Sequence, residues 1–143
     1  MVYQERNVWS SLVVTLVGLA VYVTVVLREA DGGPITAVDW APLMLWTIVG
    51  TIVVSIVVSI VWGILAGMRE PAGVGKSDIR DRDIARMGTR VEQSFVAIAG
   101  VLVLVLCAVH ADWFWIANTM FFGFAVAAVV GGIARVIAYR RGL

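Results

Sequence analysis

Charged residues are scarce in this chain of 143 residues: they make up 15% of it, whereas hydrophobic residues make up 61%. A typical soluble domain has about 25% charged residues. Four uncharged stretches occupy most of the sequence, and the mean hydropathy is +0.95, so little chain is left for a water-soluble core. The composition predicts a membrane protein and excludes a soluble enzyme domain.

Cysteine is almost missing as well, because Cys107 is the only one. A single cysteine excludes an intrachain disulfide, a thiol–disulfide pair and a multi-cysteine metal site. The formal net charge is +1, which provides no global basic field of the kind that attracts nucleic acid. We therefore expect no direct nucleic-acid partner.

Catalytic motifs are also lacking. The sequence contains no Ser–His–Asp set, no paired catalytic carboxylates, no phosphate-binding glycine motif and no dinucleotide fingerprint. No ionisable residue lies in the middle of an uncharged stretch, which argues against a proton-coupled antiporter. Quinone-linked disulfide oxidases with four spans need paired cysteines, which excludes that class too. We expect a protein that is not an enzyme and holds no cofactor.

What the chain does have is four long apolar stretches, at residues 8–27, 40–68, 93–109 and 113–134. Each can cross a hydrocarbon layer of about 30 Å as an α-helix with all its backbone amides bonded internally. We therefore predict one all-α domain over residues 1–143. It has four transmembrane helices and a cytoplasmic connector, residues 69–92, that contains a juxtamembrane helix.

The basic residues predict the orientation. All but one of the 11 Lys and Arg residues flank the predicted spans on the side that holds both termini and the connector. Arg28 alone lies on the other side. Because Lys and Arg remain preferentially on the cytoplasmic side, we expect both termini to be cytoplasmic.

Small and hydroxyl side chains recur every fourth residue along two of the spans. Span two carries Thr47, Thr51, Ser55, Ser59, Gly63 and Gly67, and span four carries Gly123, Ala127 and Gly131. Such stripes let helix backbones approach closely in lipid, so we expect them to pack the bundle or a homo-oligomer. The alternative is that the hydroxyls of span two line a polar path for water, an ion or a small solute.

The connector concentrates about half of the charge, with six basic and five acidic residues in residues 69–92. Acidic residues come early and basic residues late, which suits the dipole of a helix capped by Ser77 or Asp78. Two roles are open for its arginines, which are Arg80, Arg82, Arg86 and Arg90. They either contact anionic lipid head groups or dock a soluble protein.

The remaining polar residues predict structural roles. His110 and Asp112 stand in the short link between spans three and four, without the spacing of a metal site. A Zn²⁺ site there would need further ligands, so we expect no metal. Asn118 should bond to a neighbouring helix, and Glu92 and Arg135 should pair at the inner ends of spans three and four.

Three short motifs give the chain a resemblance that spans most of its length. They are the charged-Trp-Ser-Leu start in residues 5–12, the acidic-basic helix that begins at residues 77–83, and the closing Tyr-Arg-Arg-Gly of residues 139–142. The chain resembles a family of small prokaryotic four-span membrane proteins of unknown function, although Ile79 replaces a glutamate of that pattern. The resemblance implies a prokaryotic cytoplasmic membrane and, as a partner, a small helix-turn-helix regulator.

Together these observations predict a non-enzymatic integral membrane protein. We expect a regulatory or accessory subunit that engages a partner through its cytoplasmic charged segment. The alternative is an oligomeric channel or facilitator for a small solute or ion. Membrane lipids, further copies of the chain and a soluble regulatory protein are the expected partners.

Overall fold

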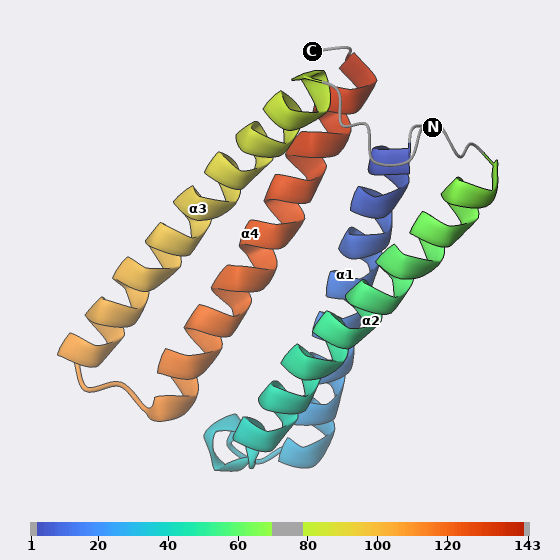
Figure 1. The fold of residues 1–143 in the computed structure, drawn as a ribbon. Coiled ribbons are helices and arrows are strands. Elements are labelled where there is room, and N and C mark those ends of the chain that lie inside the picture. The colour runs from blue at the N-terminus through green and yellow to red at the C-terminus, as the bar shows by residue number, and fades with distance from the viewer. Residues whose placement is uncertain (1–2, 70–78, 142–143) are drawn as a thin grey trace.

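A computed structural model describes residues 3–69 and 79–141 of the chain. Its elements are α1 (Tyr3–Ala30), the 3-10 helix η1 (Ile35–Ala37), α2 (Trp40–Arg69), α3 (Ile79–Ala108) and α4 (Trp113–Arg141). Helices α1 and α2 form one hairpin, and α3 and α4 form a second (Figure 1). Both ends of the chain lie at one end of the bundle, here named the terminal end. The two short links lie at the opposite, loop end.

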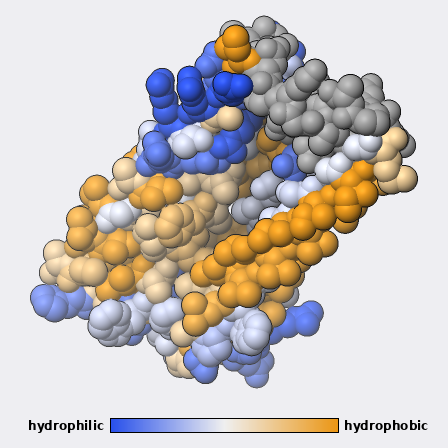
Figure 2. All heavy atoms as spheres, in the orientation of Figure 1, coloured by the Kyte–Doolittle hydropathy of each residue, from blue (hydrophilic) through white to orange (hydrophobic). Residues whose placement is uncertain are grey.

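All four long helices can cross a membrane. They have between 28 and 30 residues, and their most apolar windows have mean hydropathies between 2.1 and 2.6. At 1.5 Å per residue each is about 42–45 Å long, which exceeds a hydrocarbon core of about 30 Å. Large apolar side chains cover the outside of the bundle, and Figure 2 shows them as a band between hydrophilic ends. The predicted all-α fold with four membrane-spanning helices is confirmed.

The helices are arranged in the order α2, α1, α4, α3. Helix α4 has extensive interfaces with α3 and α1, and α2 packs mainly against α1. A buried cluster near the loop end joins three helices through Tyr22, Val26, Met44 and Phe114. The α1–α4 contact is therefore the main connection between the two hairpins.

Both links use residues that tolerate a left-handed backbone. Asp31 and Gly32 have φ angles of 41° and 78° after α1, and His110 has a φ of 55° between α3 and α4. Gly, Asp and His are among the residues most often found in that region. The Asp112 carboxylate then accepts a hydrogen bond from the Phe114 backbone N–H at 2.8 Å, which caps the start of α4.

Helix α3 joins the charged part of the predicted connector to span three. It begins at Ile79 and continues without interruption to Ala108, so the charged residues 79–92 belong to the same helix as span three. The predicted connector also contains Arg69, which the structure places at the end of α2. The predicted cap at Ser77 or Asp78 lies outside the described residues.

Candidate functional site

The charged half of α3 packs one face against α4. Ile84 and Gly88 are buried there, and a Cβ atom added to Gly88 would overlap the side chain of Arg135. Residues 84, 88 and 92 lie four apart and hence on one side of the helix. The first turns of α3 are thus held by tertiary packing, so they do not depend on helix propensity alone.

An ion pair closes this contact. The Arg135 guanidinium lies 2.9 Å from the Glu92 carboxylate, and the two side chains are 23% and 28% exposed. Each long side chain crosses the partner helix at a glycine, because added Cβ atoms on Gly88 and Gly131 would overlap Arg135 and Glu92 respectively. The predicted pairing of Glu92 with Arg135 is confirmed. We name these four residues the clasp.

The opposite face of the same segment is basic and exposed. Arg82, Arg86 and Arg90 are exposed and follow one another at intervals of four residues, so they form one row. Asp83 lies 3.7 Å from Arg86, with both side chains largely exposed. Figure 2 shows hydrophilic residues gathered at the terminal end of the bundle. The side chain of Arg80, the fourth predicted contact residue, lies outside what the structure describes.

The stripe on α2 faces α1 at the positions where the structure shows its contacts. A Cβ atom on Gly18 of α1 would overlap the Thr51 methyl group. The Thr47 and Thr51 hydroxyls donate to the Leu43 and Thr47 carbonyl oxygens of their own helix, both at 2.8 Å. The remaining members, Ser55, Ser59, Gly63 and Gly67, are half-buried.

The terminal end of α2 is tied to α1 by side-chain hydrogen bonds. The Ser59 hydroxyl donates to the Asn7 side-chain oxygen at 3.1 Å, and the Trp62 indole N–H donates to the Ser10 hydroxyl at 2.8 Å. The Arg6 guanidinium also lies 5.9 Å from the centre of the Trp62 ring. These polar side chains of α1 and α2 therefore bind each other within one chain.

The stripe on α4 faces α3. Gly123 lies against Ala99, because a Cβ atom on this glycine would overlap the Ala99 methyl group. Ala127 is 2% exposed, and Gly131 lies under Glu92 in the clasp. The stripes on α2 and α4 therefore serve different partners and do not form a shared face.

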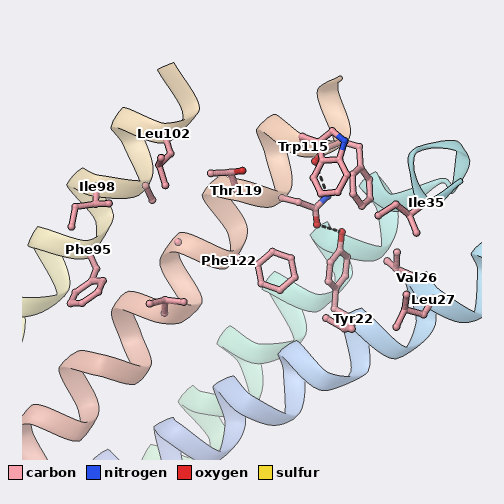
Figure 3. Close-up of a pocket in the computed structure, with 16 residues that line it drawn as sticks. Tyr22, Val26, Leu27, Ile35, Phe95, Ile98, Leu102, Trp115, Thr119 and Phe122 are labelled. Atoms are coloured by element: carbon pink, nitrogen blue, oxygen red, sulfur yellow. Dashed lines mark hydrogen bonds between the residues drawn. The ribbon is translucent and has the colours of Figure 1, made fainter. Parts of the chain in front are cut away.

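A groove of about 490 Å³ opens between α1, α3 and α4. It is mainly apolar, and its wall contains one polar pair near the loop end (Figure 3). The Tyr22 hydroxyl donates to the Asn118 side-chain oxygen at 2.8 Å, and the Asn118 amide donates to the Phe114 carbonyl oxygen at 2.9 Å. The predicted bond from Asn118 to a neighbouring helix is confirmed. Sequence reasoning missed Tyr22 as its partner, because only the packing of α1 on α4 brings the two residues together.

The structure does not group the His, Cys, Asp and Glu residues that were considered for metal binding. Within residues 3–69 and 79–141, no group of three or more His, Cys, Asp and Glu side chains is placed to hold a metal ion. Asp112 caps α4, and Cys107 is exposed. Segment 79–92 of α3 thus carries Glu92, whose predicted pairing with Arg135 joins it to α4, on one face and the exposed arginine row on the other.

These features define an α-helical multi-pass membrane protein with a charged helical extension at its terminal end. Comparison of the chain with protein-family models, curated proteins and solved structures finds no match. Any functional conclusion must therefore come from the residues of this chain.

Proposed function

We propose that this protein is a non-enzymatic regulatory or accessory subunit that engages a partner through the charged segment 79–92. The observation that carries the proposal is the continuity of α3 from Ile79 to Ala108. A regular helix transmits displacement along its axis, so a partner bound to the segment would act directly on the membrane-spanning part. The clasp would pass that displacement on to α4.

The proposal includes the orientation and the membrane. Basic residues flank the spans at the terminal end, which favours a cytoplasmic location for both termini and for the segment. The resemblance to small prokaryotic four-span proteins favours the cytoplasmic membrane of a prokaryote and stays a prediction. Anionic lipid head groups and further copies of the chain are proposed as partners within the membrane.

The alternative, an oligomeric channel or facilitator, receives no specific support from the contacts. Its proposed path used the hydroxyls of the α2 stripe, yet Thr47 and Thr51 donate to carbonyls of their own helix and Ser59 donates to α1. A pore between copies would need these groups to face a shared axis. Flux measurements on proteoliposomes test this alternative directly.

The experiment compares the intact protein with a variant whose exposed charges in segment 79–92 are replaced by Gln and Ala. Ile84, Gly88 and Glu92 are retained, so the contact with α4 is preserved. Both proteins are cross-linked in native membranes and purified, and the captured chains are identified by mass spectrometry.

A partner that is captured by the intact protein and lost with the variant supports the proposal. Recovery of only self-assembled chains from both proteins, together with solute flux above that of empty liposomes, would favour the channel. The matched control carries Asp31→Asn and Arg28→Gln, which change exposed charges at the loop end. This control should capture the same partner as the intact protein.

A further inference from the structure

We infer that the row formed by Arg82, Arg86 and Arg90 binds an acidic segment of a soluble protein, which supplies carboxylates spaced to match the row. The inference rests on the proposed function and names the chemistry of the partner. Its basis is the exposure of the three arginine side chains, the weakness of the one ion pair that the row makes within the described residues, and the direction in which the row extends.

The three arginines point away from the rest of the bundle. Ile84 and Gly88 are buried on the side of α3 that faces α4, whereas the arginines are exposed on the opposite side. Side chains four apart on a helix are neighbours, with Cβ atoms about 5–6 Å from each other. The row therefore presents three positive charges over about 12 Å of helix axis.

Among residues 3–69 and 79–141, the row makes one ion pair. Asp83 pairs with Arg86 at 3.7 Å, in a highly exposed contact that contributes little to binding either group. Within the described residues, Arg82 and Arg90 have no ion-pair partner. Glu92 is on the other face and is engaged by Arg135.

Like charges four apart repel each other along the helix. An isolated segment of this kind would tolerate that repulsion poorly, but here the burial of Ile84 and the close contact of Gly88 with Arg135 of α4 support the helix. An anionic partner relieves the repulsion, because carboxylates form charge-assisted and often bidentate hydrogen bonds with arginine. The row is thus already ordered before a partner arrives, which lowers the entropic cost of binding.

The direction of the row favours a protein over lipid head groups. A hydrocarbon core of about 30 Å takes about 20 helical residues, which places its edge near Thr89 when counted from the end of α3 at Ala108. Arg90 then lies at the membrane boundary, and Arg82 lies about 12 Å farther from the membrane. The head-group layer is only about 5–8 Å thick on each side, so lipids can reach Arg90 but not the whole row.

Binding of a defined acidic peptide tests the inference. The full chain is placed in nanodiscs of phosphatidylcholine, which has no net charge. The probe is a fluorescent alanine-rich helical peptide with glutamates at three positions four residues apart, and the control peptide has glutamine at those positions. Binding is measured by fluorescence anisotropy at low and high salt.

We expect the intact protein to bind the acidic probe and to bind it more weakly at high salt, because exposed charge pairs are screened. The variant R82Q/R86Q/R90Q should bind about tenfold more weakly or worse. The matched variant R82K/R86K/R90K keeps the charges and should retain most of the binding. Asp83→Asn removes the competing carboxylate and should strengthen binding about twofold.

Equal binding by the Gln variant and the intact protein overturns the inference. Absence of probe binding in neutral nanodiscs, combined with preferential enrichment of phosphatidylglycerol by the intact protein, assigns the row to lipids and also overturns it. All three residues are exposed, so we expect the variants to fold like the intact protein. Circular dichroism and gel filtration check this.

A photo-crosslinking amino acid separates this inference from the proposed function. It replaces Arg86 in one protein and Ala85, an exposed residue on a neighbouring face, in another. Capture of a partner segment rich in Asp and Glu from position 86, and not from position 85, supports the inference. Capture only from position 85 contradicts the inference but leaves the proposed function standing. A partner that persists without the charges of segment 79–92 contradicts the proposed function itself.

Discussion

The helices of the two hairpins are held together by different contacts. Between α3 and α4 the backbones approach at Gly123, and the clasp adds an ion pair whose two side chains cross glycines. Between α1 and α2, Gly18 meets Thr51, and hydrogen bonds from Ser59 and Trp62 of α2 reach α1 near the terminal end. The α3–α4 interface is the more extensive of the two. In this protein the more extensive interface is the one in which glycines face a small side chain or a crossing one.

The reason is that hydroxyls have an alternative partner. In lipid, helices associate through close packing and interhelical hydrogen bonds, since apolar burial between helices is worth little there. A Thr or Ser side chain can satisfy its hydroxyl on its own helix, as Thr47 and Thr51 do. A glycine has no side chain to bond, and it contributes by letting the neighbouring helix approach closely, as Gly123 does at Ala99.

The largest expected effect comes from filling a glycine contact. Gly123→Leu should lower the free energy of unfolding by about 2–3 kcal/mol, because the new side chain must push α3 away from α4 at Ala99. Unfolding of the purified protein by denaturant in detergent micelles measures the change. Gly100→Leu is the matched control on α3, since nothing lies within 4 Å of a Cβ atom there, and should change stability by less than about 0.5 kcal/mol. Equal losses for both would contradict the comparison of the hairpins.

Breaking the ion pair of the clasp should cause the second-largest loss of stability. Glu92→Ala leaves the Arg135 guanidinium half-buried without its partner, so we expect a loss of about 1–2 kcal/mol, between typical exposed and buried ion pairs. A double-mutant cycle of Glu92→Ala with Arg135→Ala measures the interaction between the two residues. The same cycle on the exposed pair Asp83 and Arg86 is the control and should give less than about 0.5 kcal/mol. A larger value for the exposed pair would show that burial is not what gives the clasp its strength.

The hydrogen bond between Tyr22 and Asn118, which links the two hairpins, should contribute less to stability than the clasp. Tyr22→Phe removes the hydroxyl that donates to Asn118 and should cost about 0.6 kcal/mol, the average for hydrogen bonds between membrane helices, and no more than about 1.7 kcal/mol, the largest value. A double-mutant cycle with Asn118→Leu, followed by unfolding in micelles, measures the coupling. Thr24→Val is the control, because the Thr24 hydroxyl donates only within α1 to the Ala20 carbonyl oxygen. Zero coupling would mean that van der Waals packing alone joins α1 to α4.

The smallest effect should belong to the hydroxyl stripe of α2. Ser59→Ala removes one hydrogen bond to Asn7 and should cost no more than about 0.6 kcal/mol. Stability in micelles and solute flux in liposomes are measured on the same preparation. A clear change of flux at nearly constant stability would reverse the interpretation of the stripe and favour the channel.

Some contacts of the site could be predicted from sequence and others could not. The pairing of Glu92 with Arg135 was predictable, because both flank the inner ends of helices joined by a tight link. The exposed row on α3 follows from residues four apart once a helix is assumed. Of the two glycines in the clasp, Gly131 was predicted as part of the packing stripe of span four, whereas Gly88 gave no signal, and a glycine does not reveal which side chain will cross it.

The sequence by itself determined the class of protein and its number of spans. Long uncharged stretches cannot be exposed to water at acceptable cost, and a helix is the structure that satisfies their backbone amides in lipid. Tertiary structure decided that the two hairpins meet mainly through α1 and α4, and that Tyr22 meets Asn118. The short links make α1 and α2, and α3 and α4, neighbours, but the four spans are similar in length and apolar character, so the fit of particular side chains decides which helices of the two hairpins meet.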